Sequence, residues 1–398
     1  MLGGRLIEGP SGAGEAGVYI HYPWCRSRCP YCDFPIAVAP LPEIPHRPYL
    51  TAVLDELAVR ARELEGRRLV SIYFGGGTPS IWPADCLAEA VAAVCAAFAA
   101  DRSALEITIE ANPVDCTAER MAGWREAGID RVSIGVQSLA SDELVSLGRD
   151  HRMGDGPAAI DAALSAGFRR LSADLILGAP PLVRSARGTA EDALAGAATL
   201  AGRGVPHLSV YELTVAEGTP LHRQVERGEV IPEDEDRLAE LYLGADRLLT
   251  AAGYEHYEVS SYARPGARAV HNSLYWRTAE YLGLGSGASS FRRDPDGSGL
   301  RWSNHRSVGR YLAAPAGERQ ASSEPLAADQ LRADRIWLGL RTSDGVPAEA
   351  LDGRGPLRDW LVASGLVEVG SERIRPTLRG FLYSDQVARR VLDEFRYP

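Results

Sequence analysis

Hydrophobic and polar positions follow two alternating periods over the first two thirds of the chain. Short runs rich in Val, Ile and Leu alternate with longer, alanine-rich stretches whose apolar positions repeat with a helical period. This alternation is typical of β/α units and predicts a parallel sheet covered by helices. The strand candidates are residues 18–22, 69–74, 105–110, 130–136, 170–177 and 207–213, and the helical patterns lie near 48–66, 84–100, 117–127, 156–167, 189–203 and 235–252. Six such units in series predict an α/β fold with a parallel β/α barrel, an incomplete one, over residues 17–262.

The pattern changes after about residue 320, where three helices, a small hairpin turning at Gly370 and Ser371, and a closing helix are expected. This order resembles a winged helix, so we predict a winged-helix-like domain over residues 321–398. Its acidic and basic residues are mixed, which favours packing or partner contact over DNA binding. The remaining segments are an extension at 263–320, a disordered leader at 1–16, and exposed loops at 180–188 and 292–299.

Composition narrows the classes of partner. A chain of 398 residues that is 45% hydrophobic can bury a sizeable core. Its net charge of −10 and its lack of any lysine argue against a surface that follows nucleic-acid phosphates. No apolar run reaches the roughly 18 residues that a membrane-spanning helix requires, and no secretory signal is visible. We therefore expect a cytoplasmic protein that binds no nucleic acid and has no transmembrane segment.

Three closely spaced cysteines carry the clearest chemistry. Cys25, Cys29 and Cys32 follow the first predicted strand with the spacing C-x3-C-x2-C. Thiolates hold iron–sulfur clusters, and complete ligation of a 4Fe-4S cube takes four ligands. Three cysteines therefore leave one iron open. An open coordination position is what distinguishes a reactive metal centre from a structural one.

A zinc site and a disulfide are the alternative interpretations of these cysteines. A zinc site wants a fourth Cys or His at short spacing, and the nearest histidines, His21 and His46, fit no common zinc pattern. A disulfide would leave an odd cysteine and needs an oxidising compartment. We therefore favour the iron–sulfur cluster. The other cysteines lie in or beside helical stretches, where a buried free thiol is the ordinary outcome; they are Cys86, Cys95 and Cys116.

Glycines and polar residues follow the predicted strands, where parallel barrels bind their ligands. Gly75, Gly76 and Gly77 follow the second strand, and their lack of Cβ atoms lets the backbone approach a ligand, although a tight turn uses glycines in the same way. Glu110 ends the third strand and can accept bonds from ribose hydroxyls or an ammonium. Together with the cysteines, these strand ends predict a cofactor site. Its other members at the fourth and fifth strands are Gln137, Arg149 and Asp174.

Seven segments of the chain recur in this order in one known group of proteins. They are HYPWCRSRCPYCDF, FGGGTPS, EANP, IGVQS, LGRDH, DLILGAP and HLSVYELT. The chain resembles, over nearly its whole length, the branch of the radical S-adenosylmethionine (SAM) superfamily that contains oxygen-independent coproporphyrinogen III oxidases and the HemW haem chaperones. In that superfamily the amino and carboxylate groups of SAM chelate the open iron. The resemblance implies a radical-SAM-type barrel with a 4Fe-4S cluster and SAM.

The resemblance also implies roles for individual residues and assigns no catalytic residue. The metal ligands would be Cys25, Cys29 and Cys32. The residues that would contact SAM are Tyr19, Tyr31, Gly76, Gly77, Thr78 and Glu110. Further SAM contacts of the oxidase, including those to its second SAM molecule, match Gln137, Arg149 and Asp174, and Thr214 after the sixth strand is an additional candidate.

Two features favour the chaperone branch over the oxidase. The oxidase carries a further cysteine two residues after its third cluster cysteine, and Phe34 stands at that place here. The segment His271-Asn272-Ser273-Leu274-Tyr275-Trp276 fits the HNxxYW motif that is characteristic of the HemW group. An imidazole is a standard axial ligand for haem iron, and aromatic faces can pack on the porphyrin. By this resemblance the haem-binding residues are His271, Tyr275 and Trp276.

One departure from the family affects the second haem ligand. The segment from Gly283 to Ser290 resembles a glycine-rich stretch in which family members commonly carry a histidine where Ser289 stands. His256 and His305 are possible substitutes, although their spacing singles out neither.

The sequence thus predicts a haem chaperone that binds haem and passes it to an acceptor protein, with a respiratory protein as one possible acceptor. SAM would sit on the open iron, with or without turnover. The alternative is an enzyme of the oxidase type. In that case a reduced cluster would cleave SAM, and the resulting radical would abstract hydrogen from a coproporphyrinogen propionate.

Overall fold

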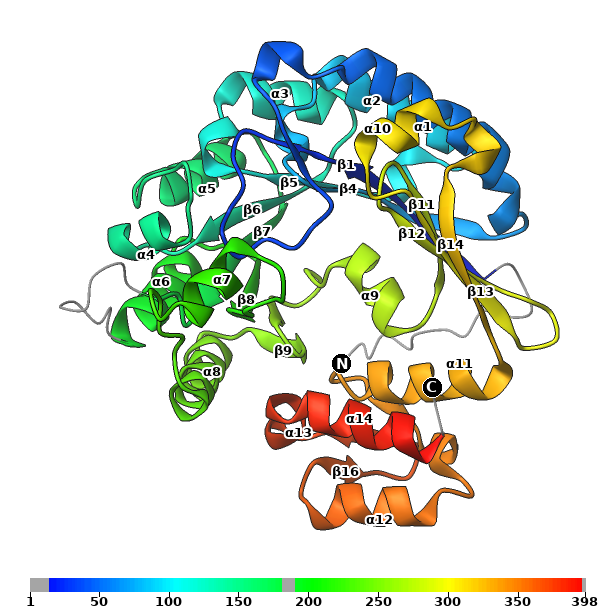
Figure 1. Cartoon of the computed structure of the whole chain (residues 1–398). Coiled ribbons are helices and arrows are strands. Elements are labelled where there is room, and N and C mark those ends of the chain that lie inside the picture. Colours follow the sequence, from blue (N-terminus) through cyan, green and yellow to red (C-terminus); the bar gives the residue numbers. More distant parts are fainter. Residues whose placement is uncertain (1–13, 181–189, 396–398) are drawn as a thin grey trace.

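The computed structural model describes residues 14–180 and 190–395 and shows a large curved sheet with helices around its outer face (Figure 1). Most of the predicted leader and of the loop predicted at 180–188 lies outside the described residues. Seven parallel strands form the centre of the sheet. In spatial order they are β11 (Glu280–Leu284), β1 (Glu15–Tyr22), β4 (Arg68–Gly76), β5 (Glu106–Ala111), β6 (Arg131–Gln137), β7 (Arg170–Leu177) and β8 (His207–Glu212).

The predicted fold class, an incomplete parallel β/α barrel, is confirmed. The six predicted strands form in the predicted order, and each is followed by helix. Helices that cover the outer face are α1 (His46–Arg60), α2 (Ala84–Ala97), α3 (Ala118–Glu126), α5 (Asp155–Ser165), α6 (Ala190–Gly202) and α8 (Glu235–Ala251). Two shorter helices, α4 (Ser141–Ser146) and α7 (Pro220–Glu226), follow β6 and β8.

Alternation along each strand separates an apolar outer face from a polar inner face. On β4, Ile72 and Phe74 are fully buried in the main core, whereas Ser71 and Tyr73 point inward and bond to groups inside the barrel. Because successive side chains of a strand point to opposite faces, the same division recurs on the neighbouring strands. The lumen of this barrel is therefore lined with polar groups, and its open end can hold a charged ligand.

Strands missed by the sequence analysis extend the sheet at both edges. On the β11 side, three antiparallel strands follow; they are β12 (Ser289–Arg293), β13 (Gly299–Asn304) and β14 (Gln320–Leu326). On the β8 side lie β10 (Ser261–Ala263) and β9 (Glu255–Glu258). A short helix, α9 (Val270–Trp276), crosses the inner side of the sheet, and α10 (Val308–Ala313) follows β13. Strand β14 thus continues the sheet past the boundary predicted at residue 320.

The C-terminal segment has a hydrophobic core of its own, formed by residues such as Ile336, Leu357 and Val391. Its elements are α11 (Ala328–Gly339), β15 (Val346–Pro347), α12 (Gly355–Ala363), β16 (Val367–Val369), β17 (Arg373–Pro376), α13 (Leu378–Leu382) and α14 (Ser384–Glu394). The predicted hairpin corresponds to β16 and β17, which pair antiparallel. Among the helices of the described residues, none has the length and apolar character needed to cross a membrane.

Candidate cluster and cofactor site

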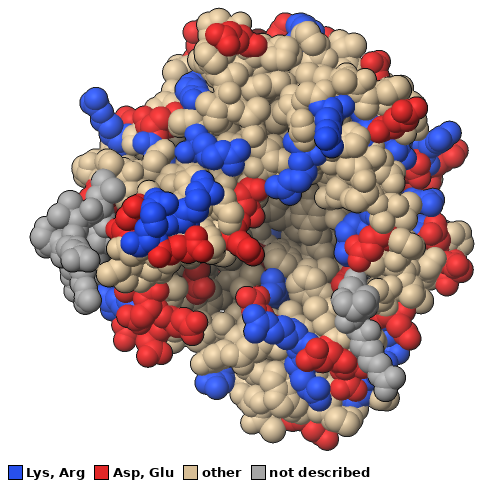
Figure 2. All heavy atoms as spheres, in the orientation of Figure 1, with Lys and Arg blue, Asp and Glu red and all other residues tan. Residues whose placement is uncertain are grey.

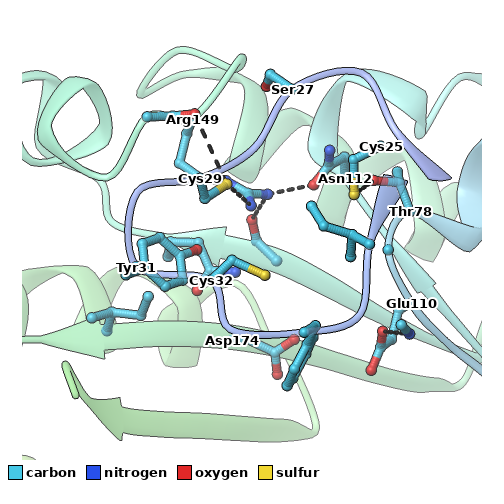
Figure 3. Close-up of a pocket in the computed structure, with 18 of the residues that line it drawn as sticks. Cys25, Ser27, Cys29, Tyr31, Cys32, Thr78, Glu110, Asn112, Arg149 and Asp174 are labelled. Atoms are coloured by element: carbon cyan, nitrogen blue, oxygen red, sulfur yellow. Dashed lines mark hydrogen bonds between the residues drawn. The ribbon is translucent and has the colours of Figure 1, made fainter. Parts of the chain in front are cut away.

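A cavity of about 560 Å³ opens at the carboxyl ends of the parallel strands. Figure 2 shows it as the hollow near the centre of the view, and Figure 3 shows the side chains that line it. The predicted residues that line it are Cys25, Cys29, Tyr31, Cys32, Gly76, Gly77, Thr78, Glu110, Gln137, Arg149, Asp174 and Thr214. Residues from one loop and five strand ends, far apart in sequence, therefore meet at a single place.

The three cysteines lie on the loop that follows β1, here called the cluster loop (residues 23–45). Cys25 belongs to β2 (Trp24–Cys25), which pairs with β3 (Ala37–Val38) and so draws the two ends of the loop together. An ion pair between Arg26 and the buried carboxylate of Asp115 ties the loop to the end of β5. All three thiols are free and face the same cavity.

The spread of these thiols bears on the metal they would hold. Among the described residues, no three Cys, His, Asp or Glu side chains gather closely enough for one metal ion. A zinc site needs such a tight tetrahedral group, with sulfur at about 2.3 Å from the ion. A cube of four irons and four sulfides is larger and takes its thiolates at separate corners. Three free thiols on one loop that face the same cavity suit three corners of such a cube.

Neighbouring groups compensate the charge that bound thiolates would carry. Burial raises the pKa of Cys25 to about 11, while the Thr78 hydroxyl, which donates to Sγ at 3.3 Å, opposes this rise. The Arg149 guanidinium lies 3.6 Å from Cys29 Sγ and also donates to Asn112 (Figure 3). A metal deprotonates a coordinating thiol, and a nearby cation favours the charged form. Arg149, predicted as a SAM contact, therefore lies beside a cluster ligand.

The structure shows a further reason why glycines are needed after β4, besides the approach of a ligand. We expected the missing Cβ atoms to let a ligand approach, and Gly76 and Gly77 do line the cavity. However, a Cβ on Gly77 would lie 2.7 Å from the Trp24 carbonyl oxygen, and one on Gly76 would lie 2.5 Å from the His21 ring. Gly76 also has a positive φ of 112°. Gly76 and Gly77 are therefore required by close packing against the end of β1 and the start of the cluster loop, respectively.

Two carboxylates face the cavity with raised pKa values. Glu110 accepts hydrogen bonds from the Tyr73 hydroxyl at 2.8 Å and from the Gly76 amide at 3.1 Å. Burial nevertheless raises its pKa to about 7. Burial also raises the pKa of Asp174 to about 6, although the Ser133 hydroxyl donates to it at 3.1 Å. Both groups would be stabilised as anions by a bound ligand with positive charge or hydroxyl donors.

Gln137 adds backbone strain at the same cavity. It ends β6 with a φ of +63°, a region that non-glycine residues seldom adopt. The pairing of β6 with β7 shifts register between Ile134 and Gln137. Such strain persists only where the surrounding structure imposes it, and it concentrates at ligand sites. Gln137 is therefore held in its place at the cavity by the fold.

Tyr19, the other predicted SAM contact, is not among the residues that line the cavity. Its hydroxyl bonds to His21 Nδ1 at 3.0 Å, and its ring stacks on Tyr73 with centroids 6.0 Å apart. Tyr19 thus pairs with Tyr73 across β1 and β4 and lies beside it in the lumen.

The haem-binding residues predicted from the HNxxYW motif lie at the other end of the barrel. Helix α9 carries them, and His271 is buried against Ser71 and Glu106 near the amino ends of β4 and β5. Its Nδ1 bonds to Ser71 Oγ at 2.8 Å and its Nε2 to the Tyr275 hydroxyl at 2.8 Å. In this conformation neither ring nitrogen is free for a haem iron. Ligation by His271 would require α9 to leave its place.

The motif is nevertheless connected to the cavity. The His271 ring stacks on Tyr73 with centroids 4.9 Å apart, and the Tyr73 hydroxyl holds Glu110. His271 is therefore a positioning residue for Glu110, acting through Tyr73. Burial lowers its pKa to about 3, so it is neutral in the folded protein near neutral pH.

Sequence reasoning missed several residues of this site. Asn112 accepts from Arg149, Ser133 donates to Asp174, and Tyr73 donates to Glu110. Period-2 alternation on β4 and β6 puts Tyr73 and Ser133 on the inner face, which was the available signal. Asn112 stands in the EANP segment two residues after Glu110 and was not predicted as a site residue.

The barrel and its three-cysteine loop define a class of protein. The sequence model of the radical SAM superfamily matches residues 19–193, which run from β1 into α6. The solved structure of coproporphyrinogen III oxidase (HemN) from Escherichia coli aligns with a TM-score of 0.78, covering 95% of this chain and 90% of that one. Their identity is 19%, so this likeness shows the fold alone. This is a radical SAM protein.

More similar relatives place it within the superfamily. Heme chaperone HemW of Mycobacterium tuberculosis H37Rv is 36% identical over 381 residues, which cover 94% of each chain. Heme chaperone HemW of Escherichia coli K12 is 38% identical over 300 residues, covering 74% of this chain and 76% of the relative. The chain belongs to the HemW family.

Proposed function

We propose that this protein binds haem and transfers it to an acceptor protein, while holding a SAM-binding 4Fe-4S cluster at the mouth of its barrel. The observation that carries this proposal is the extent of the likeness to proteins named heme chaperones. At 94% of the chain, the match to the Mycobacterium tuberculosis relative is too long for the barrel alone. It includes the extension strands and most of the C-terminal elements as well.

The cavity supports the cofactor part of the proposal. Cys25, Cys29 and Cys32 would hold three irons, and the fourth would face the cavity. Glu110 and Asp174 offer hydrogen-bond acceptors to the ammonium or the hydroxyl groups of SAM. When both are bound, a reduced cluster supplies an electron for cleavage of SAM. The Arg149 guanidinium lies 3.6 Å from Cys29 Sγ, where its positive charge would offset part of the negative charge of a thiolate-bound cluster.

A radical SAM oxidase of the HemN type is the second candidate function. It is favoured by the shared fold and by a cavity that could also seat a substrate. Two observations weigh against it. Phe34 stands where the oxidase carries another cysteine, and 54% of it is exposed to solvent. The Mycobacterium tuberculosis and Escherichia coli HemW relatives, both above 30% identity, are named chaperones and not oxidases.

The proposal for the acceptor protein rests on the chemistry of haem ligation alone. Haem passes most readily to an apoprotein with a stronger axial ligand set, and a respiratory haem protein fits this description. The net charge of −10 gives the chain no general attraction to an anionic membrane surface. We therefore propose a direct contact between the two proteins as the transfer step.

Two assays test this function on reconstituted full-length protein. Titration with haem should give a Soret band that saturates near one haem per chain, and the loaded protein should yield its haem to an excess of apomyoglobin. Incubation of the reduced protein with SAM and coproporphyrinogen III should form no protoporphyrinogen IX. Formation of that product, with no saturable haem binding, would replace the chaperone by the oxidase. The Cys29→Ala variant, which removes a cluster ligand, is the control for product made without the cluster.

A further inference from the structure

The chain has eight histidines that could supply an axial ligand to haem iron, and most of them are buried or already hydrogen-bonded in the structure. Four are at most 4% exposed: His21, His151, His207 and His271. The ring of His256 is bonded through both nitrogens, to Asp246 at 2.9 Å and to Tyr242 at 3.3 Å. The histidines that remain accessible are His46, His222 and His305.

The surroundings of these three differ. The His46 ring bonds to the Tyr22 hydroxyl at 3.0 Å, and burial lowers its pKa. The carboxylate of Asp85 acts on the His46 ring, and the adjacent Arg47 is already paired with Asp85 and Glu89. Carboxylates repel the two propionates of haem. This makes His46 a poor site for haem.

His222 has a similar disadvantage, since its Nδ1 lies 3.7 Å from the carboxylate of Glu226. His305 is different. It is half-buried, and within the described chain its ring has no hydrogen-bond partner. An imidazole with both nitrogens uncommitted can bind a metal without first breaking a contact.

The backbone places His305 against the cluster loop. Its carbonyl accepts a hydrogen bond from the Gly287 amide at 2.9 Å. Gly287 in turn abuts Pro35, since a Cβ there would lie 2.5 Å from Pro35 Cγ. The next residue, Arg306, donates from Nη2 to the Asp33 carbonyl at 2.9 Å. His305 therefore lies beside the rim of the cavity, to which Asp33 and Phe34 contribute.

The adjoining surface is apolar. Phe34 is 54% exposed and Val38 is 53% exposed, although both are large hydrophobic residues. Ile36 between them also lines the cavity. A porphyrin face is a flat apolar surface, and contact with it would remove these side chains from water.

Two guanidinium groups border the same surface. Arg306 and Arg28 are both exposed. Arg306 donates to the backbone carbonyl of Asp33, and Arg28 donates to that of Ile36 at 3.2 Å, so both are anchored to the cluster loop. A guanidinium has five donors in a fixed fork, so each keeps donors free for a carboxylate. Figure 2 shows basic side chains along the upper edge of the hollow, where the cluster loop and α10 lie in Figure 1.

We propose that haem is received at this rim, with His305 as its axial ligand, its apolar face on Phe34 and Val38, and its propionates toward Arg28 and Arg306. This assignment rests on the proposed haem-binding function and names its site. It places the cargo beside the cluster cavity, at the opposite end of the barrel from His271. The exposed site lets an acceptor protein reach the haem without opening the barrel.

Haem titration of the cluster-loaded full-length protein tests the assignment. His305→Ala should weaken haem binding about tenfold or more, a loss of about 1.4 kcal/mol per factor of ten. The matched controls are His46→Ala and His222→Ala, which each remove an accessible imidazole elsewhere and should leave the titration unchanged. SAM binding, followed by the change in the EPR spectrum of the reduced cluster, should be the same in all four proteins.

The outcomes separate this assignment from the function on which it rests. If the wild-type protein fails to bind haem, the proposed function fails with it. If the wild type binds haem and His305→Ala binds it equally well, the rim site is overturned while the function stands. Loss of binding in His271→Ala alone would assign haem to the motif helix instead.

A second variant keeps a ligand at the position and reports coordination directly. His305→Tyr replaces the imidazole by a phenol, so ferric haem should change from an imidazole-type to a phenolate-type absorption and magnetic circular dichroism spectrum. An unchanged spectrum would show that residue 305 does not touch the iron. The double variant Arg28→Ala, Arg306→Ala should weaken binding of haem but not of its dimethyl ester, which lacks the propionate charges.

Discussion

Both ends of the barrel are lined by polar side chains, yet the base is closed and the mouth is open. At the base, helix α9 covers the lumen, and Ser71, Glu106 and Tyr275 each form a hydrogen bond with His271. At the mouth, a cavity of about 560 Å³ remains among thiols and carboxylates. The comparison shows that a polar lumen becomes a ligand site only where the fold leaves its groups without sufficient partners.

Burial acts on both ends and shifts their pKa values in opposite directions. It lowers the pKa of His271 at the base to about 3 and raises that of Glu110 at the mouth to about 7. In each case the neutral form is favoured. The base remains neutral over the physiological range, whereas Glu110 lies close to its titration point and can be shifted by what binds beside it.

The largest expected effect is at the mouth. Replacing Cys29 by Ala should remove the cluster, because two thiolates cannot hold the cube. Iron analysis after anaerobic reconstitution should fall from about four irons per chain to nearly none. Cys95→Ala, which changes a thiol outside the cavity, should retain the full iron content. A normal cluster spectrum in Cys29→Ala would contradict the ligand assignment.

The next largest effect is expected at the base of the barrel, at His271. His271→Ala leaves the Ser71 and Tyr275 hydroxyls without their buried partner, and should lower the free energy of unfolding by about 2 to 4 kcal/mol. It should also weaken SAM binding, because the ring that supports Tyr73 is lost. Denaturant unfolding and SAM titration measure the two effects.

Tyr73→Phe is the matched control for this connection. It keeps the stacked ring and removes only the hydroxyl that donates to Glu110. SAM affinity should fall with little loss of stability, and the two substitutions should be non-additive in SAM binding. Additive effects would show that His271 does not act through Tyr73.

The smallest effect concerns pH. The folded pKa of Glu110 is raised above its unfolded value, so the unfolded state loses its proton first as pH rises. Glu110 should therefore reduce the stability of the ligand-free protein progressively between about pH 4.5 and pH 7.

Glu110→Gln removes this titration. Above pH 7 the ligand-free variant should be more stable than the wild type by about 1 to 3 kcal/mol, and it should bind SAM more weakly. Thermal unfolding at pH 5 and pH 8 measures the difference. An equal Tm shift at both pH values would show that Glu110 is not buried in the way described. Gln137→Glu is not a suitable control, because Gln137 lines the same cavity.

The sequence by itself determined the features that depend on neighbouring residues. Apolar residues that repeat every 2 or every 3.6 positions located six strands, β1 and β4 to β8, and the helices between them. They do so because burial of one face of a strand or helix dictates the spacing of its apolar residues. The same reasoning placed Cys25, Glu110 and Gln137 at strand ends, and parallel strands bring their ends to one edge.

Only the tertiary structure decided what lies against what. β11 pairs with β1 although the two strands are far apart in the chain. Nothing in the sequence of either segment indicates this pairing. The residue types of the motif around His271 suit haem, but only the fold shows that the His271 side chain is buried against the base of the barrel. His305 was one histidine among several until the Gly287 turn brought it to the cluster loop. The sequence gives the chemical type of each side chain. Whether a ligand can reach that side chain depends on packing between distant segments, which the local pattern of apolar residues does not show.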